Sequence, residues 1–181
     1  MKVIARRTGW QNSKTLNYKF EKALYKFVNA KLESPPDKRY PGNGDSSLID
    51  LKRGAIDAAD EKYIGYEGND MIAWLDLGNK CNLSGLSASY LVNHRSFVMA
   101  PAQLEVWAAT EDGKKLNRLG VVSTHESGLQ KDAIRKVLSL KFPMQSLRYI
   151  IVKIKNIGKT PAWHPSKGSK SWIFIDEIIA G

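Results

Sequence analysis

The chain has 181 residues, of which 43% are hydrophobic and 25% are charged, a composition typical of a globular protein with one well-buried core. Its formal net charge of +10 favours anionic partners, but the lysines and arginines are scattered and form no run of five. No apolar run approaches the roughly 18 residues that a membrane span needs. A single cysteine, Cys81, excludes an internal disulfide and a cysteine-based metal cluster.

The first part of the chain shows little regular pattern. Residues 1–21 are expected to form an arm or linker, and their charged start lacks the apolar segment of a secretory signal. Residues 22–28 suit either a short strand or a helical turn. Three prolines and two glycines within residues 33–44 predict a loop there.

From residue 71 onward the sequence predicts one strand after another, at 71–77, 83–92, 103–110, 118–123, 134–142, 148–155 and 172–179. Alternation with period two places Leu138, Leu140 and Phe142 on one strand face. The segment 111–114, Glu-Asp-Gly-Lys, suits the turn of a hairpin. Because no amphipathic helix separates the strands, parallel βαβ units are not expected. The pattern predicts an all-β antiparallel sandwich or jelly roll.

Three stretches carry a resemblance to a known family. Residues 40–54, from Tyr-Pro-Gly-Asn-Gly to Asp-Leu-Lys-Arg-Gly, and residues 63–78, which end in Asp-Leu-Gly, are similar to a discoidin (coagulation factor V/VIII type C) domain. Segments within residues 148–178, including Lys-Thr-Pro-Ala-Trp-His-Pro at 159–165, resemble the discoidin-like C-terminal domain of bacterial β-N-acetylhexosaminidases. The resemblance covers residues 22–181 and implies an eight-stranded jelly roll related to galactose-binding modules. The chain departs from the pattern at Leu51, where the family usually has a glycine.

Aromatic and polar residues of three expected loops form the candidate sugar site. Sugars bind through a flat ring against their C–H face and a few polar groups that fix the hydroxyls. In the resembling sugar-binding modules such loop residues, at one end of the sandwich, hold the ligand. The candidates are Tyr66, His94, Arg95, Phe97, Trp163 and His164. As an alternative, Trp163 and its neighbours pack beneath the long loop 156–171 and order it.

The resemblance also implies a structural calcium site, built from a loop aspartate, main-chain carbonyls and a glutamate of the last strand. Asp50 and Glu177 match the two carboxylates, and the carbonyls of Ser47, Lys52 and Asp176 are the expected companions. Two carboxylates with carbonyls suit calcium, which takes six to eight oxygen ligands. In the alternative, Asp50 caps its own turn and Glu177 pairs with a lysine.

Catalytic motifs are lacking. No serine elbow, HExxH or P-loop occurs, no carboxylate pair suits glycoside hydrolysis, and His94, His125 and His164 fit no local zinc pattern. We therefore expect a non-catalytic carbohydrate-binding module of a glycoside-hydrolase system that recognises galactose- or N-acetylhexosamine-type glycans.

The resemblance implies that the chain acts beside, or is a piece of, a β-N-acetylhexosaminidase, and that its location is extracytoplasmic. One alternative is a purely structural domain that packs against a neighbouring catalytic domain. Another is binding of polyanions through the basic surface, although no nucleic-acid motif points to nucleic acid.

Overall fold

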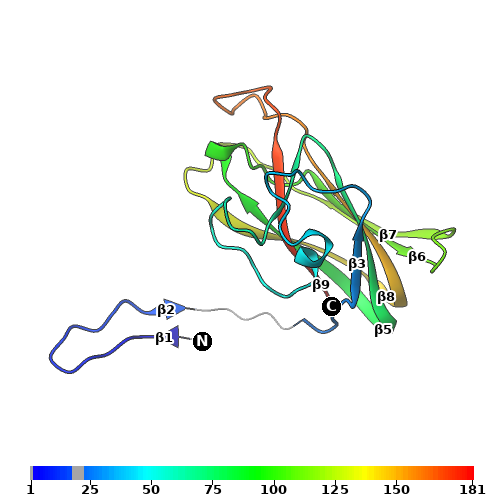
Figure 1. The fold of residues 1–181 in the computed structure, drawn as a ribbon, viewed down its shortest axis with the longest axis horizontal. Coiled ribbons are helices and arrows are strands. Elements are labelled where there is room, and N and C mark those ends of the chain that lie inside the picture. The colour runs from blue at the N-terminus through cyan, green and yellow to red at the C-terminus, as the bar shows by residue number, and fades with distance from the viewer. Residues whose placement is uncertain (1, 18–22) are drawn as a thin grey trace.

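The structure is a computed structural model that describes residues 2–17 and 23–181. Figure 1 shows a β-protein with two short 3₁₀ helices, η1 (Gly44–Leu48) and η2 (His94–Ser96). The strands are β1 (Lys2–Val3), β2 (Leu16–Asn17), β3 (Asn29–Leu32), β4 (Ile64–Glu67), β5 (Met71–Val92), β6 (Gln103–Ala109), β7 (Leu116–Ser123), β8 (Ile134–Lys155) and β9 (Trp172–Ala180). These strands pair antiparallel with one another. The expected antiparallel β-sandwich is confirmed.

Two long strands pass through both layers of the sandwich. The first part of β5 pairs with β3 on one side and with the second part of β8 on the other. The second part of β5 pairs with β9 and with the first part of β8. Register shifts between Asp76 and Cys81 and between Leu83 and Gly85 mark the bend. One layer is therefore β3-β5-β8-β6-β7, and the other is β4-β9-β5-β8.

These bends correct part of the strand prediction. Strands 71–77 and 83–92 were expected to be separate, as were 134–142 and 148–155, but each pair is one continuous strand of 22 residues. Bulges let a strand bend sharply without ending, so the turn-like residues between the predicted strands mark a bend instead of a break.

The core follows the predicted alternation. Leu138, Leu140 and Phe142 are buried, as expected, and Ile150 and Val152 have no exposed surface. Each large apolar side chain that is removed from water contributes about 1.5–3 kcal/mol. The packed core thus makes the sandwich a rigid frame for the loops at its end.

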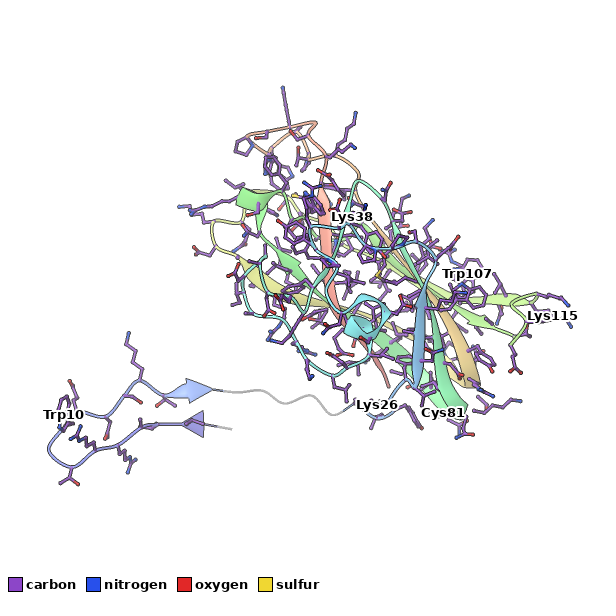
Figure 2. All side chains as sticks on the ribbon, viewed as in Figure 1. Trp10, Lys26, Lys38, Cys81, Trp107 and Lys115 are labelled. Carbon is purple, nitrogen blue, oxygen red and sulfur yellow. The ribbon has the colours of Figure 1, made fainter. Side chains whose placement is uncertain are left out.

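The N-terminal arm lies apart from the sandwich (Figure 1). Strands β1 and β2 pair through two residues each, and Trp10 at the tip of this hairpin is 68% exposed (Figure 2). In the described part of segment 22–28, Tyr25 forms a β-bridge with Ala180, which favours the strand-like alternative. The expected boundary between residues 21 and 22 lies outside the described residues. None of the described helices is long and apolar enough to cross a membrane.

Candidate functional site

Three loops meet at one end of the sandwich, which we call the loop end: residues 93–102, 124–133 and 156–171. They meet because β5 ends where β8 begins, with Val92 opposite Ile134. The Ala102 amide donates to the Lys155 carbonyl at 2.7 Å, and the Trp172 amide donates to the Phe97 carbonyl at 2.9 Å. The three loops lie at the upper end of the molecule in Figure 1.

Two histidines lock these loops together. His94 is 1% exposed and His164 is 6% exposed. Nδ1 of His94 accepts the Gln130 amide at 2.8 Å, and Nδ1 of His164 accepts the Ser166 amide at 3.0 Å. Because each Nδ1 accepts a hydrogen bond, the ring proton of the neutral tautomer lies on Nε2. Nε2 of His164 then donates to the His94 carbonyl at 2.8 Å. The ring nitrogens of both histidines are therefore engaged in bonds within the protein.

Glu126 connects all three loops. Its Oε1 lies 3.2 Å from Nε2 of His94, and its Oε2 accepts the Ala100 amide at 3.1 Å. The Glu126 carbonyl accepts the Trp163 indole N–H at 3.3 Å. The sequence analysis missed this residue because a glutamate in an irregular segment has no periodicity or motif to distinguish it.

Phe97 and Trp163 are half-buried and pack on the two histidines. The Trp163 ring centroid lies 5.0 Å from that of His94, and the Phe97 centroid lies 5.6 Å from that of His164. Phe97 has a φ of 61°, a left-handed conformation that costs a non-glycine residue about 1–2 kcal/mol. The surrounding contacts hold Phe97 in this conformation, and the contact of Trp163 with His94 fits the ordering role expected for Trp163.

A cavity of about 230 Å³ opens beside Trp163. Its lining combines the Trp163 ring with Pro161 and the polar side chains of His125, Glu126 and Lys159. His125 is exposed, and the sequence analysis had considered it only as a zinc ligand. A ring beside a few polar groups is the combination that sugar recognition needs. The cavity volume suits a terminal sugar better than a long chain.

The predicted ligand contacts are only partly brought together. Tyr66 is buried in β4, and its hydroxyl donates to the Ser34 carbonyl at 2.8 Å. Burial removes Tyr66, His94 and His164 from the predicted ligand contacts, because their polar atoms already bond to the protein. Arg95 is exposed in η2, but neither it nor Phe97 lines the cavity. Ligand contact by Arg95, Phe97 and Trp163 stays a prediction.

A second group of side chains surrounds Glu177 in β9. Glu177 is 1% exposed, and neither of its carboxylate oxygens has a hydrogen-bond partner among the described residues. Burial, together with the charges of Asp50 and Asp176, raises the pKa of Glu177 to about 8. Asp176 is also fully buried, and its Oδ2 accepts the Gly54 amide at 2.6 Å, while its Oδ1 has no hydrogen-bond partner in the described part of the chain. Burial raises the pKa of Asp176 as well.

The loop that contains Asp50 adopts the backbone conformation of a glycine turn. Asp50 accepts the Lys52 amide at 2.8 Å, as the turn-capping alternative expects, and Leu51 has a φ of 62°. Leucine therefore takes the left-handed conformation that the usual glycine would adopt. The hydroxyl of Ser47 accepts the Asn43 amide at 2.8 Å.

The chemistry of this group suits a hard cation. Buried carboxylates without partners are costly unless a positive charge compensates them, and carboxylate and carbonyl oxygens are the ligands of calcium. In the described residues, no group of three or more His, Cys, Asp and Glu side chains is arranged to hold a metal ion. A cation here would therefore depend on main-chain carbonyls for its remaining ligands.

No protein-family model matches the chain, and no curated protein matches it. Several solved structures, however, match the chain in fold. A CBM32 carbohydrate-binding module from Clostridium perfringens, in complex with GalNAc-β-1,3-galactose, aligns at 16% identity with a TM-score of 0.52, covering 83% of this chain and 92% of that one. A chitosan-binding module of a Paenibacillus chitosanase/glucanase aligns at 10% identity with a TM-score of 0.51, covering 88% and 96%.

A third structure, the CBM32 of an AlyQ protein in complex with 4,5-unsaturated mannuronic acid, aligns at 15% identity with a TM-score of 0.50, covering 87% and 96%. The chain has the fold of carbohydrate-binding modules. The discoidin-like, galactose-binding-like sandwich that the sequence resemblance implied is thereby confirmed at the level of fold.

Proposed function

We propose that the protein is a non-catalytic carbohydrate-binding module whose loop end binds a terminal galactose or N-acetylhexosamine of a glycan. The observation that carries the proposal is the cavity beside Trp163, lined by an aromatic ring, an exposed imidazole and a lysine. The fold supports it, because a structure of the same fold is in complex with GalNAc-β-1,3-galactose.

The residues of the cavity have separable roles. The Trp163 ring offers an apolar surface for the C–H face of a pyranose, while His125 and Lys159 offer hydrogen bonds to its hydroxyls. Glu126 positions the ring through its carbonyl and ties the neighbouring loop through its carboxylate. Because these contacts exist without ligand, binding requires little ordering.

A shallow site of this kind binds weakly, with a Kd of about 0.1–1 mM. Tethering to a catalytic domain raises the effective concentration of the module at its substrate. We propose a glycoside hydrolase as that neighbour, and an extracytoplasmic location where such glycans occur.

Titration calorimetry with β-galactosides and N-acetylhexosaminides tests the proposal. Trp163→Ala and His125→Ala are each expected to weaken binding about tenfold. Trp10→Ala is the matched control, because it removes an exposed tryptophan from the distant arm. The purely structural alternative predicts no binding to any sugar, and the polyanion alternative predicts affinity that falls steeply with salt. Either result, or unchanged binding by Trp163→Ala, would refute the proposal.

We also propose that Asp50 and Glu177 hold a structural calcium ion, with the carbonyls of Ser47, Lys52 and Asp176 as further ligands. When bound, the cation would supply the positive charge that the buried carboxylate of Glu177 lacks. It would tie the loop after η1 to β9, on a part of the sandwich that the sugar cavity does not share. Its test is thermal unfolding in calcium and in chelator.

A further inference from the structure

The outer face of the layer β3-β5-β8-β6-β7 carries a row of side chains that the loop-end site does not use. Trp74 of β5 and Trp107 of β6 both lie opposite Ile151 of β8, one on each side. Lys31 of β3 pairs with Trp74, and Arg118 of β7 pairs with Trp107, which completes the row. Directly paired residues share a face of a sheet, so all five point away from the core.

Both tryptophans are only half-buried on this outer face. Figure 2 shows Trp107 on the side of the molecule where the β6–β7 hairpin projects, with Lys115 near its tip. The Cα atoms of Trp74 and Trp107 are two strand spacings apart, about 9.6 Å. That is close to the length of one disaccharide in an extended β-linked polysaccharide.

A groove of about 460 Å³ runs beside Trp74. Trp74 and Tyr149 supply its rings, and Asn29, Glu33 and Glu111 are among its polar side chains. The β6–β7 turn forms one wall, because Glu111 lines the groove and a Cβ at Gly113 would lie 2.7 Å from the Trp74 ring. With its φ of +68°, Gly113 lets the turn approach the ring.

The charges of this face compensate one another, although the protein as a whole is strongly basic. Arg148 pairs with Asp76 at 2.9 Å, and Lys153 pairs with Asp70 at 3.2 Å. Arg118 lies 3.7 Å from Glu105 and stacks over Trp107. Lys31 has no ion pair among the described residues, but it lines the groove together with Glu33 and Glu111. Because the other cations are already paired, a polyanion would gain little here, and the face suits a neutral occupant.

We propose that this face is a second carbohydrate site, which takes the extended chain of a neutral linear polysaccharide across the strands. Trp74 contacts one sugar ring, and the polar side chains of the groove bind the hydroxyls near it. Trp107 contacts a sugar one disaccharide away, together with the Arg118 guanidinium that lies over its ring. The site differs in occupant from the loop end: the loop-end cavity takes a terminal sugar, whereas the larger groove beside Trp74 takes the interior of a chain that continues over Trp107. It does not depend on the loop-end proposal.

Affinity electrophoresis in gels that contain soluble neutral β-glucan, xylan or galactan, followed by calorimetry with the retarding polymer, tests the inference. At least one polymer is expected to retard the protein. Trp74→Ala and Trp107→Ala are expected to weaken polymer binding about tenfold each, whereas Trp74→Phe keeps a ring and loses less. Trp10→Ala, which removes an exposed tryptophan from the distant arm, is the matched control and leaves polymer binding unchanged.

The failures of the two proposals are distinguishable. Loss of monosaccharide binding in Trp163→Ala concerns only the loop end, and loss of polymer binding in the Trp74 and Trp107 variants concerns only the sheet face. If Trp74→Ala does not fold, Tyr149→Ala replaces it, since Tyr149 lines the same groove. The inference is overturned if no neutral polymer retards the wild type or if Trp163→Ala alone abolishes retardation.

Discussion

Replacing Glu177 by glutamine separates the cost of a buried charge from its use as a cation ligand. The change keeps the shape of the side chain and removes only its ability to ionise. Without calcium, the wild-type protein must either bury an unpaired carboxylate or keep it protonated, because neither Glu177 oxygen has a hydrogen-bond partner within residues 2–17 and 23–181. We therefore expect Glu177→Gln to be more stable than the wild type in chelator at pH 8, and the wild type to gain from calcium.

The magnitude follows from the pKa of Glu177, which burial raises from an ordinary 4.5 to about 8. A folded-state pKa above the unfolded value means that the folded protein binds more protons between these two limits. Stability is then greatest below pH 4.5 and falls as the pH rises to about 8. At 1.36 kcal/mol for each pKa unit, the full loss is at most about 5 kcal/mol. The buried Asp176 adds to the same slope, since its pKa is also raised.

The assay is thermal or urea unfolding between pH 4.5 and 8.5, in chelator and in millimolar calcium. In chelator the wild type should lose stability with rising pH, and Glu177→Gln should lose less. In calcium the wild type should keep its stability at pH 8, because a bound cation holds the carboxylate ionised. Glu177→Gln should respond little to calcium.

Two results would refute this reasoning. If the wild type and Glu177→Gln show the same pH dependence in chelator, the carboxylate is not desolvated as the structure shows. If calcium stabilises both proteins equally, the cation binds elsewhere. Lys52→Ala serves as a matched control, because only the main-chain carbonyl of Lys52 is proposed as a ligand.

Three further predictions concern single positions. Glu126→Ala should destabilise the protein by about 2–3 kcal/mol, because it leaves the Ala100 amide and His94 without their acceptor; urea unfolding measures this, and an unchanged midpoint contradicts it. Leu51→Gly should stabilise the protein by about 1 kcal/mol in thermal unfolding by relieving a positive φ, whereas Leu51→Ala should not. Gly113→Ala should cost about 1–3 kcal/mol in urea unfolding, and a smaller loss would show that the turn can move away from Trp74.

The sequence predicts the layers of this fold better than its connections. Alternation identified the core faces, because burial on one side of a strand imposes period two on residues such as Leu138 and Leu140. It could not show that β5 and β8 each run through both layers. A bulged bend and a hairpin both interrupt the alternation with small and polar residues, and only long-range pairing distinguishes them.

The candidate site was predictable in place but not in detail. The loops 93–102 and 156–171 were identified because rings and histidines gather there, and both loops lie at the loop end. The sequence could not show which polar atoms bond inward. His94 and His125 look alike as loop histidines, yet one is locked between Glu126 and Gln130 while the other is exposed beside the cavity. Hydrogen-bond partners 30 or more residues apart carry no local signal.

The loop end and the sheet face show opposite ways of presenting an aromatic ring. At the loop end, Trp163 is held by its indole hydrogen bond to Glu126 and by the His94 ring, so an irregular loop needs several buried polar contacts to position one side chain. On the sheet, Trp74 and Trp107 are positioned by strand register alone, through their shared neighbour Ile151. If the loop end binds sugar as proposed, substitutions in its loops can change the kind of terminal sugar without disturbing the sandwich. The spacing of the sheet tryptophans cannot change without altering the strands, and it suits a repeating ligand for that reason.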